Sequence, residues 1–402
     1  MGAKMKLLLI LESHFYIDNN GEVWCDRVVD YNFLKRYMSS FSEIIVCGRT
    51  DDNNKEKYKL KVSGPNVSFR KLPNFYGIKG LIKNLFKIRK LIGEYIDEAD
   101  VVLYRVPTPL SLFTYKEVLK RNKVLGAEFM ISADKMIEGK GFVKDFLNKK
   151  IDNIAKDICK KANGVSYVTD YVLQQKYPSQ SLLKGKETKD FFTASYSTIE
   201  LDKSNLELRN WRIDDEPKKF KLIHTGFMDT YRKGQDILIR AVKILIDDGY
   251  NIELTLIGDG KKRQEFESLS HELGIEENVI FLGSVKDKQR IFNCLKESHL
   301  LVFPTESEGL PRTIIEAMAV GLPCISSPVD GIVELLNENY LVEERTPEEY
   351  SKKIKELLSN WEKMIQAGNE NYNKALKYEK SILDSRRQSF YKKLSDLANS
   401  KK

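Results

Sequence analysis

The sequence predicts an α/β protein of two doubly wound domains that face each other across a cleft. Its 402 residues are enough for two hydrophobic cores of ordinary size, and 42% of them are hydrophobic against 31% charged. Short apolar runs that indicate strands alternate with amphipathic segments that indicate helices, in both halves of the chain. This alternation is typical of parallel sheets that helices cover on both faces.

The alternation is most regular from residue 220 onward. Strands are expected in the segments "FKLIHTG", "NIELTLIGDG", "NVIFLG", "HLLVFP" and "LPCISSP". Helices are expected in "GQDILIRAVKILIDDG", "KKRQEFESLSHELG", "DKQRIFNCLKES", "PRTIIEAMAVG" and "DGIVELLN". We therefore expect one doubly wound domain over residues 220–375.

The first half, residues 1–200, shows the same pattern less cleanly and predicts a second doubly wound domain. Strands are expected at 6–11, 43–47, 101–104, 124–129 and 164–168, and helices at about 78–97 and 142–162. The polar stretch 49–66 indicates a loop or hairpin. The charged stretch 201–219 indicates a linker, and the helical segment 376–402 is expected to pack back on the first domain.

Charge is distributed unevenly between the two halves. Residues 1–200 carry 34 Lys and Arg against 24 Asp and Glu, a net charge of +10, whereas the other 202 residues carry 32 against 34. This asymmetry indicates different partners for the two halves.

The five cysteines show no Cys-x-x-Cys pair and the four histidines show no metal-ligand spacing, so neither a disulfide framework nor a metal site is expected. The apolar run 7–11 is too short for a signal-peptide core, and no run of about 18 apolar residues occurs. We therefore expect a cytoplasmic protein.

The segment "FPTESEGLPRTIIEAMAVGLP", residues 303–323, carries the first candidate site. Seven residues separate Glu308 from Glu316, and Pro311 between them is suited to a first helical position. The free N–H groups of a helix start bind anions, and carboxylates accept hydrogen bonds from sugar hydroxyls. Acids near a helix start also complement its dipole, with Glu316 then pairing with Arg312. The spacing alone leaves both interpretations open.

Most of the second half resembles the retaining glycosyltransferases of family 4, which share the GT-B fold of two Rossmann-like domains. The resemblance runs through "RKGQDILIRA", "LIGDGKKRQEFESLSHELGIEENVIFLGSV" and "LVFPTESEGLPRTIIEAMAVGLPCISSPVDGIVELL", which is similar to that family's Glu-x7-Glu core. "VVLYRVPTPL" and "ANGVSYVTDYV" extend it weakly into the first half.

The resemblance implies a role for each matching residue. Glu316 would hold the ribose hydroxyls of a nucleotide sugar, Glu308 would lie near the donor sugar, and Lys233 would contact the diphosphate. Gly309, Leu310 and Pro311 form the loop that reaches the donor sugar, and Thr313 falls near the ribose and phosphate.

Two departures from the family pattern concern donor binding. Phe227 stands after Gly226, where the family usually has a phosphate-binding arginine, and Arg232 is a nearby substitute. The loop after the first strand usually contains paired glycines, whereas "ESHFYIDNNGEVW" offers only Gly21.

A third departure concerns the acceptor side. A histidine that many members use after the fourth strand is missing from "LGAEFMISADKMIEG". Asp134 or Ser132 could occupy that space, although Asp134 also suits a helix cap. His14 is expected in the first loop, either facing the cleft or as a plain surface histidine.

The expected activity is transfer of a sugar from a nucleotide-sugar donor, most readily a UDP-sugar, to a glycan or lipid-linked glycan in bacterial surface polysaccharide synthesis. The sugar would be a hexose or an N-acetylhexosamine. Lys233 and the helix start would stabilise the leaving phosphate, and because no Asp-x-Asp occurs we expect a metal-independent route without a cofactor. Retention of configuration is implied by the resemblance. The alternatives are a non-catalytic nucleotide-sugar-binding or partner protein and a nucleotide-sugar epimerase, against which the Glu-x7-Glu motif argues.

The basic amphipathic stretch 76–96 leaves two interpretations open. Apolar residues recur there at helical spacing among lysines and an arginine. A core-packing helix with a solvated basic face has this pattern, and so does a helix that docks on an anionic membrane surface on the inner face of the membrane. Nucleic acid is not expected as a partner, because no known binding module accompanies the charge.

Overall fold

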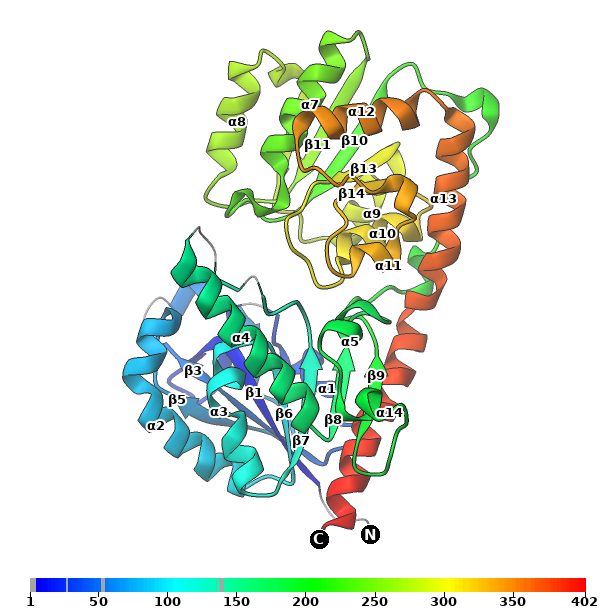
Figure 1. Cartoon of the computed structure of the whole chain (residues 1–402). Helices are drawn as coiled ribbons and strands as arrows, with labels where there is room; N and C mark the ends of the chain where they lie inside the picture. The colour runs from blue at the N-terminus through cyan, green and yellow to red at the C-terminus, as the bar shows by residue number, and fades with distance from the viewer. Residues whose placement is uncertain (1–4, 27, 52–54, 135, 138–140) are drawn as a thin grey trace. The chain divides into compact units, whose positions relative to one another are not determined.

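The computed structural model describes residues 5–26, 28–51, 55–134, 136–137 and 141–402. The chain forms two compact units (Figure 1): Met1–Tyr196 together with Asp384–Lys402, and Ser197–Leu383. Within the described residues, none of the helices combines the length and the apolar character needed to cross a bilayer.

The first unit is built on a mainly parallel sheet. Its strands are β1 (Lys6–Ile17), β2 (Val23–Cys25), β3 (Glu43–Thr50), β4 (Leu60–Lys61), β5 (Val67–Leu72), β6 (Val101–Val106), β7 (Val124–Phe129), β8 (Gly164–Tyr167) and β9 (Phe192–Ser195). Parallel pairs give the order β5-β3-β1-β6-β7-β8-β9, and β2 and β4 add an antiparallel extension beside the end of β1. The run Leu7–Leu11 of β1 is at most 2% exposed, because helices cover both faces of the sheet.

Right-handed crossovers decide which face each helix covers. The helices are α1 (Tyr31–Lys35), α2 (Gly77–Asp97), α3 (Pro109–Lys120), α4 (Phe142–Lys161), α5 (Val172–Lys176), α6 (Gln180–Leu183) and α14 (Lys380–Ser400). The crossovers through α2, α3 and α4 advance across the sheet in one direction, so these helices share one face (Figure 1). The crossover through α1 runs the opposite way and places α1 on the other face. Tyr37, just after α1, contacts Tyr391 of α14 at 4.7 Å between ring centroids.

Two glycines let α14 lie close against the first sheet. A Cβ atom on Gly126 would come within 2.9 Å of Leu394, and one on Gly164 would come within 2.9 Å of Phe390. The carboxylate of Glu128, also on β7, is buried and accepts a hydrogen bond of 2.6 Å from the hydroxyl of Tyr391. Burial and the charge of Glu128 raise the pKa of Tyr391 well above its usual range, so the tyrosine stays a donor. Residues from Asp384 onward therefore belong to the first unit.

The second unit has a purely parallel sheet. Its strands are β10 (Phe220–Thr225), β11 (Ile252–Ile257), β12 (Val279–Gly283), β13 (Leu300–Phe303) and β14 (Cys324–Ser326), in the order β12-β11-β10-β13-β14. Its helices are α7 (Gln235–Asp247), α8 (Arg263–Glu272), α9 (Lys288–Glu297), α10 (Arg312–Ala319), α11 (Ile332–Leu335), α12 (Pro347–Leu358) and α13 (Trp361–Ala375). The strand order reverses between β10 and β13, and such a switch point is where doubly wound sheets bind ligands.

The stretch 201–219, expected to be a linker, lies within the second unit. The guanidinium of Arg209 donates to the carbonyls of Leu295, Ser298 and Val320, which lie in the last turn of α9 and at the C-caps of α9 and α10. Carbonyls at helix ends lack partners within the helix, so the partly buried Arg209 satisfies carbonyls at both ends. The rings of Trp211 and Trp361 contact each other in a tilted arrangement, with 4.7 Å between their centroids. The charge of Arg209 thus helps this stretch to pack against the second unit. A search for strand or helix periodicity does not detect such a contact.

Acidification should destabilise the second unit. His224 is fully buried in β10, and burial lowers its pKa to about 4 from a usual 6.5. As the pH falls from about 6.5 to 4, His224 therefore binds a proton in the unfolded chain but not in the folded unit. This difference lowers the free energy of unfolding by about 3 kcal/mol at pH 4. Because Trp211 and Trp361 lie in this unit and Trp24 in the first, urea unfolding of Trp24→Phe followed by fluorescence measures the second unit alone. His299, whose pKa burial also lowers to about 4, adds to the same loss.

The His224→Gln variant is the control for this prediction. The amide of glutamine can still donate to the carbonyl of Lys233, which the Nε2 atom of His224 contacts at 3.0 Å, but it does not titrate. Between pH 4 and pH 6.5, the slope of its free energy of unfolding against pH should correspond to the uptake of about one proton fewer on unfolding. An unchanged slope would contradict the assignment.

Candidate functional site

A pocket of about 510 Å³ lies in the second unit at the carboxyl ends of its strands. Its walls come from the loops that follow β10, β11, β12 and β13, together with α9 and α10. The lining residues are Thr198, Thr225, Gly226, Phe227, Lys233, Ile257, Gly258, Asp259, Ser284, Val285, Lys288, Ile291, Phe303, Glu308, Leu310, Pro311, Arg312, Thr313 and Glu316. Lys233, Glu308, Leu310, Pro311, Thr313 and Glu316, predicted from the sequence, thus come together around one cavity.

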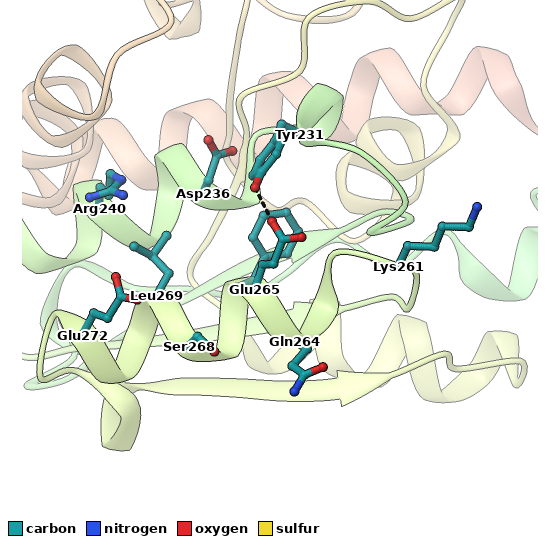
Figure 2. Close-up of a pocket in the computed structure, with 10 residues that line it drawn as sticks. Tyr231, Asp236, Arg240, Lys261, Gln264, Glu265, Ser268, Leu269 and Glu272 are labelled. Atoms are coloured by element: carbon teal, nitrogen blue, oxygen red, sulfur yellow. Dashed lines mark hydrogen bonds between the residues drawn. The ribbon is translucent and has the colours of Figure 1, made fainter.

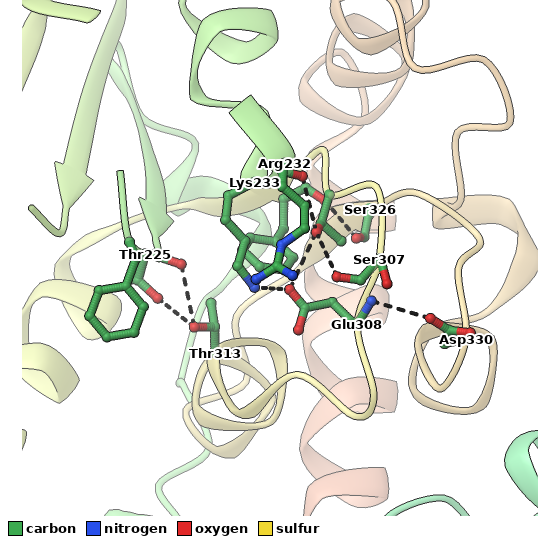
Figure 3. Close-up of polar contacts among 12 residues, drawn as sticks. Thr225, Arg232, Lys233, Ser307, Glu308, Thr313, Ser326 and Asp330 are labelled. Atoms are coloured by element: carbon green, nitrogen blue, oxygen red, sulfur yellow. Dashed lines mark hydrogen bonds and ion pairs between the residues drawn. The ribbon is translucent and has the colours of Figure 1, made fainter. Parts of the chain in front are cut away.

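Lys233 is held at the pocket by the short helical turn Tyr231–Lys233 and the glycine after it. Gly234 has a φ of +77°, and a Cβ atom there would lie 2.2 Å from the carbonyl oxygen of Pro304. Only glycine therefore lets this turn pack against the loop after β13. That packing brings the ammonium group of Lys233 beside the carboxylate of Glu308, with which it forms an ion pair (Figure 3).

The carboxylate of Glu308 is fixed from more than one side. Thr305 donates a 3.3 Å hydrogen bond from its hydroxyl to the Oε1 atom that also contacts Lys233. The N–H of Glu308 donates to the Oδ2 atom of Asp330 at 3.3 Å, which ties the loop to the segment before α11 (Figure 3). The ammonium of Lys233 also lies 5.2 Å from the centre of the Phe303 ring. The opposite charges hold each other in the pocket.

Helix α10 begins one residue later than expected, with Pro311 as its N-cap and Arg312 as its first residue. Proline supplies no capping side chain, so the first N–H groups of the helix keep no partner from the cap. The hydroxyl of Thr313 meets that of Thr225 at 2.6 Å, which fixes the helix start against the end of β10. A helix start with free N–H groups at a pocket wall favours an anion.

Glu316 lies on the pocket side of α10, while Ile315, Met318 and Ala319 are fully buried as predicted. Burial raises the pKa of the Glu316 carboxyl above its usual value, and the charges of Arg312 and Lys288 oppose that rise. The carboxyl of Glu316 is therefore partly shielded from water, and its oxygens face the cavity. Such an acid can accept hydrogen bonds from a ligand that brings its own hydroxyl groups.

The floor of the pocket is bare backbone. Gly258 has a φ of +143°, and a Cβ atom there would lie 1.9 Å from the carbonyl oxygen of Gly226. The loops after β10 and β11 therefore touch directly, as they could not with a side chain at this position.

Three of the predicted donor-side residues do not line the pocket: Arg232 and Gly309 of the second unit, and Gly21 of the first. Arg232 is exposed, and its contribution is its carbonyl, which accepts from the N–H of Glu306 at 2.8 Å. Gly309 lies between two lining residues, and its carbonyl accepts from the N–H of Gly331 at 2.9 Å. Phe227 does line the pocket and is 72% exposed.

Gly21, His14 and Asp134 lie in the first unit. Gly21 has a φ of +81° in the turn between β1 and β2, where its N–H donates to the carbonyl of Asp18 at 3.0 Å. The positive φ that this turn requires explains why a glycine stands at position 21. His14 is on β1 rather than in the first loop, because the strand continues to Ile17. Its ring stacks on Tyr76 at 4.9 Å, and burial lowers its pKa.

Asp134 forms an ion pair of 2.6 Å with Lys176, whose ammonium also donates to the hydroxyl of Ser132. Burial alone would raise the pKa of Asp134, but the hydrogen bond and charge of Lys176, together with the hydrogen bond from Ser132, outweigh burial, and the pKa is lowered. The helix-cap interpretation is wrong, because α4 begins at Phe142 with Gly141 as its N-cap.

Several pocket residues were missed in the sequence. Asp259, Ser284 and Lys288 all follow strands whose ends reach the same sheet edge, so the strand pattern contained the signal that would have found them. Asp330, in the loop after β14, was missed as well, and its contact with Glu308 bridges two loops 22 residues apart.

A second hollow of about 500 Å³ is lined by residues around α7 and α8 (Figure 2). Its walls carry Arg240 and Lys261 beside Asp236, Glu265 and Glu272, and the hydroxyl of Tyr231 is hydrogen-bonded to Glu265. It holds none of the residues predicted for the site. The pocket at the switch point is therefore the candidate site.

Residues 211–374 match the family model described as glycosyl transferases group 1. Protein CapJ of Staphylococcus aureus is 28% identical over 342 residues, which cover 84% of this chain and 82% of CapJ. The amylovoran biosynthesis glycosyltransferase AmsK of Erwinia amylovora is 32% identical over 147 residues, 35% of either chain. The matched segment contains all six charged residues that line the pocket: Lys233, Asp259, Lys288, Glu308, Arg312 and Glu316.

The solved structures extend the likeness to both units. HepE from Anabaena in complex with UDP-glucose has a TM-score of 0.63 to this chain at 15% identity, and the match covers 96% of this chain and 98% of HepE. The fold class predicted from the sequence, two Rossmann-like α/β units of the GT-B type, is confirmed.

The Glu316→Gln variant should be more stable than the natural chain in the absence of ligand. Because burial raises the pKa of Glu316, the folded unit holds a proton that the unfolded chain releases, and stability falls as the pH rises through that window. Removing the charge should raise the thermal midpoint at pH 8 by a few degrees and leave it unchanged at pH 4.

Glu306→Gln is the matched control, since Glu306 is exposed on the same loop. It should change the midpoint at neither pH. Destabilisation of Glu316→Gln at pH 8 would show instead that the carboxylate is a stabilising partner.

Proposed function

We propose that this chain is a retaining, metal-independent glycosyltransferase. It takes a hexosyl or N-acetylhexosaminyl group from a nucleotide sugar, most readily a UDP-sugar, and gives it to a glycan or lipid-linked glycan in surface polysaccharide synthesis. The observation that carries the proposal is the pocket in which Lys233, the free start of α10 and two glutamates surround one space. The polysaccharide role is supported by the similarity to AmsK, and the UDP donor by the similarity to the HepE complex.

The positive end of the pocket suits the leaving diphosphate. Breaking the bond between sugar and phosphate places negative charge on the phosphate oxygens, and fixed donors stabilise that charge most when they point at it beforehand. The ammonium of Lys233 and the N–H groups at the start of α10 are such donors. They supply the positive charge that this step requires, which supports a route without a metal ion.

The two glutamates act at different ends of the donor. Glu316 lies furthest along α10 and would accept hydrogen bonds from the ribose hydroxyls. Glu308 lies beside Lys233 and would face the sugar, where its charge opposes the positive charge that develops on the ring. Gly309, Leu310 and Pro311 would pass along the donor sugar, with Thr313 near the phosphate.

The ion pair gives the ligand-free pocket a defined starting state. Lys233 and Glu308 neutralise each other until a diphosphate offers the lysine a stronger partner. Donor binding would then release the carboxylate toward the sugar. Each of the two residues is therefore needed after binding as well as before it.

Replacement of either charged residue should abolish slow donor hydrolysis. Release of nucleoside diphosphate from the cognate donor should fall about a hundredfold or more in Glu308→Ala and in Lys233→Ala. The double variant should lose little more than either single variant, since the pair acts as a unit. Glu306→Ala, an exposed neighbour on the same loop, is the control and should retain activity.

The same assay separates an active transferase from a protein that only binds the nucleotide sugar. The exposed Phe227, in place of a phosphate-binding arginine, is the observation that favours binding without transfer. Tight donor binding without turnover by the natural chain, on any acceptor extract, would overturn the enzymatic proposal.

A thermal-shift screen should identify the donor. UDP-, GDP- and ADP-sugars differ in the base that the pocket must recognise, and CMP-sugars also lack the second phosphate. One class should therefore stabilise the protein by about 3 kcal/mol at a hundredfold excess over Kd. We expect the UDP-sugars to do so, and Glu316→Ala to remove most of that gain. Equal shifts with all four classes would argue against a nucleotide-specific site.

A further inference from the structure

Helix α2 has two apolar faces. Leu81, Ile88, Ile92 and Ile96 are fully buried against the first unit. On the opposite side, Ile82 is 56% exposed and Phe86 is 87% exposed. These two residues share a stripe of helical spacing with Lys79, Lys83 and Lys90, all exposed. Core packing therefore explains only half of the amphipathic pattern seen in the sequence.

Helix α4 repeats this arrangement in its first two turns. Phe142 is 85% exposed and Val143 is 70% exposed, followed by the exposed Phe146 and Leu147. Lysines lie among them at 144, 149 and 150, and the ammonium of Lys150 lies 4.4 Å from the centre of the Phe146 ring. Single exposed apolar side chains are ordinary, but six of them on two helices of one sheet face are not.

Both helices lie on the same face of the first sheet, with α3 between them. Arg89 of α2 donates to the carbonyl of Phe113 in α3 at 3.1 Å, and Tyr115 of α3 is hydrogen-bonded to Asp157 of α4. Both helices follow parallel strands, β5 and β7, so both begin at the carboxyl edge of the sheet. We call the exposed residues 79, 82, 83, 86 and 90 of α2 and 142, 143, 146, 147, 149 and 150 of α4 the lysine–phenylalanine face.

We propose that the lysine–phenylalanine face docks on an anionic lipid bilayer. The segment from Gly77 to Gly93 contains five basic residues and no acidic residue. Phenylalanines inserted at the boundary of headgroups and acyl chains, with lysines beside them on the lipid phosphates, are what a helix lying in the interface requires. The cores of protein interfaces are depleted in lysine, so the interleaving of the two residue types favours lipid over protein.

This inference goes beyond the proposed function and does not depend on the donor pocket. Its consequence for the reaction, however, rests on that function: a lipid-linked acceptor would be presented at the carboxyl edge of the first sheet. Parallel sheets bind ligands at this edge.

Flotation of the full chain with vesicles, without donor or acceptor, tests the proposal. The natural chain should bind vesicles of phosphatidylcholine mixed with phosphatidylglycerol, and should not bind phosphatidylcholine alone. Lys79→Gln, Lys83→Gln and Lys90→Gln combined should weaken binding about a hundredfold, since each lysine contributes about fivefold. Phe86→Ser, Phe142→Ser and Phe146→Ser combined should abolish binding.

A matched control lies elsewhere in the first unit. Leu182 and Leu183 are 43% and 52% exposed, and Lys184 and Lys186 beside them are exposed as well. Changing these leucines to serine and lysines to glutamine should leave vesicle binding unchanged. An equal loss in this control would show unspecific adsorption and overturn the proposal.

Three other results would also overturn it: no vesicle binding by the natural chain, equal binding to neutral vesicles, or a natural dimer that the phenylalanine variant dissociates in light scattering. The last would identify a second copy as the occupant of the face. Thermal midpoints of each variant, with and without a UDP-sugar, show that both units remain folded. Because flotation needs no donor, failure of the proposed activity leaves this test intact.

Discussion

The second unit depends on the meeting of β10 and β13 in the middle of its sheet. Strands on either side of this point connect in opposite directions, so the loops after β10 and β13 part and leave a space at their carboxyl ends. Gly234 and Gly258 let those loops approach backbone to backbone, and α10 starts where they separate. The position of Lys233 beside Glu308 follows from this geometry, since the two come from loops 75 residues apart.

The pocket trades stability for binding. The carboxyl of Glu316 is shielded from water, which raises its pKa. The ammonium of Lys233 and the carboxylate of Glu308 form an ion pair with few other partners. An apolar pocket of the same shape would fold at least as well, because taking charges out of water is costly. Retention of these groups at a cavity makes sense when a ligand completes their hydrogen bonds. His224 and the partly buried His299, by contrast, belong to the packing of the sheet: His224 lies in β10, and the N–H of His299 donates to the carbonyl of Lys221 in the same strand.

The architecture could be predicted from the sequence because it rests on local patterns. Apolar runs such as 124–129 mark strands wherever both faces are covered, and the amphipathic segments between them mark helices. The site was predictable where it follows a strand, as at Glu308 and Thr313. Prediction failed where long-range contacts decide: Arg209 turns an apparent linker into a cap for α9 and α10, and the pairing of β1 with β3 places His14, opposite Arg49, in a strand. Exposed Phe142 and Phe146 look like core residues until their neighbours are known.

The last helix also sets an order of events during synthesis. Tyr391 satisfies the buried carboxylate of Glu128, yet it follows that residue by 263 positions, with the whole second unit in between. A ribosome therefore delivers a complete second unit before it delivers the side chains that cover one face of the first sheet. Until then Gly126 and Gly164 leave that face open to water and to other nascent chains. The N-terminal unit is thus the last part of the molecule to finish folding, and chaperone demand should fall on its uncovered sheet.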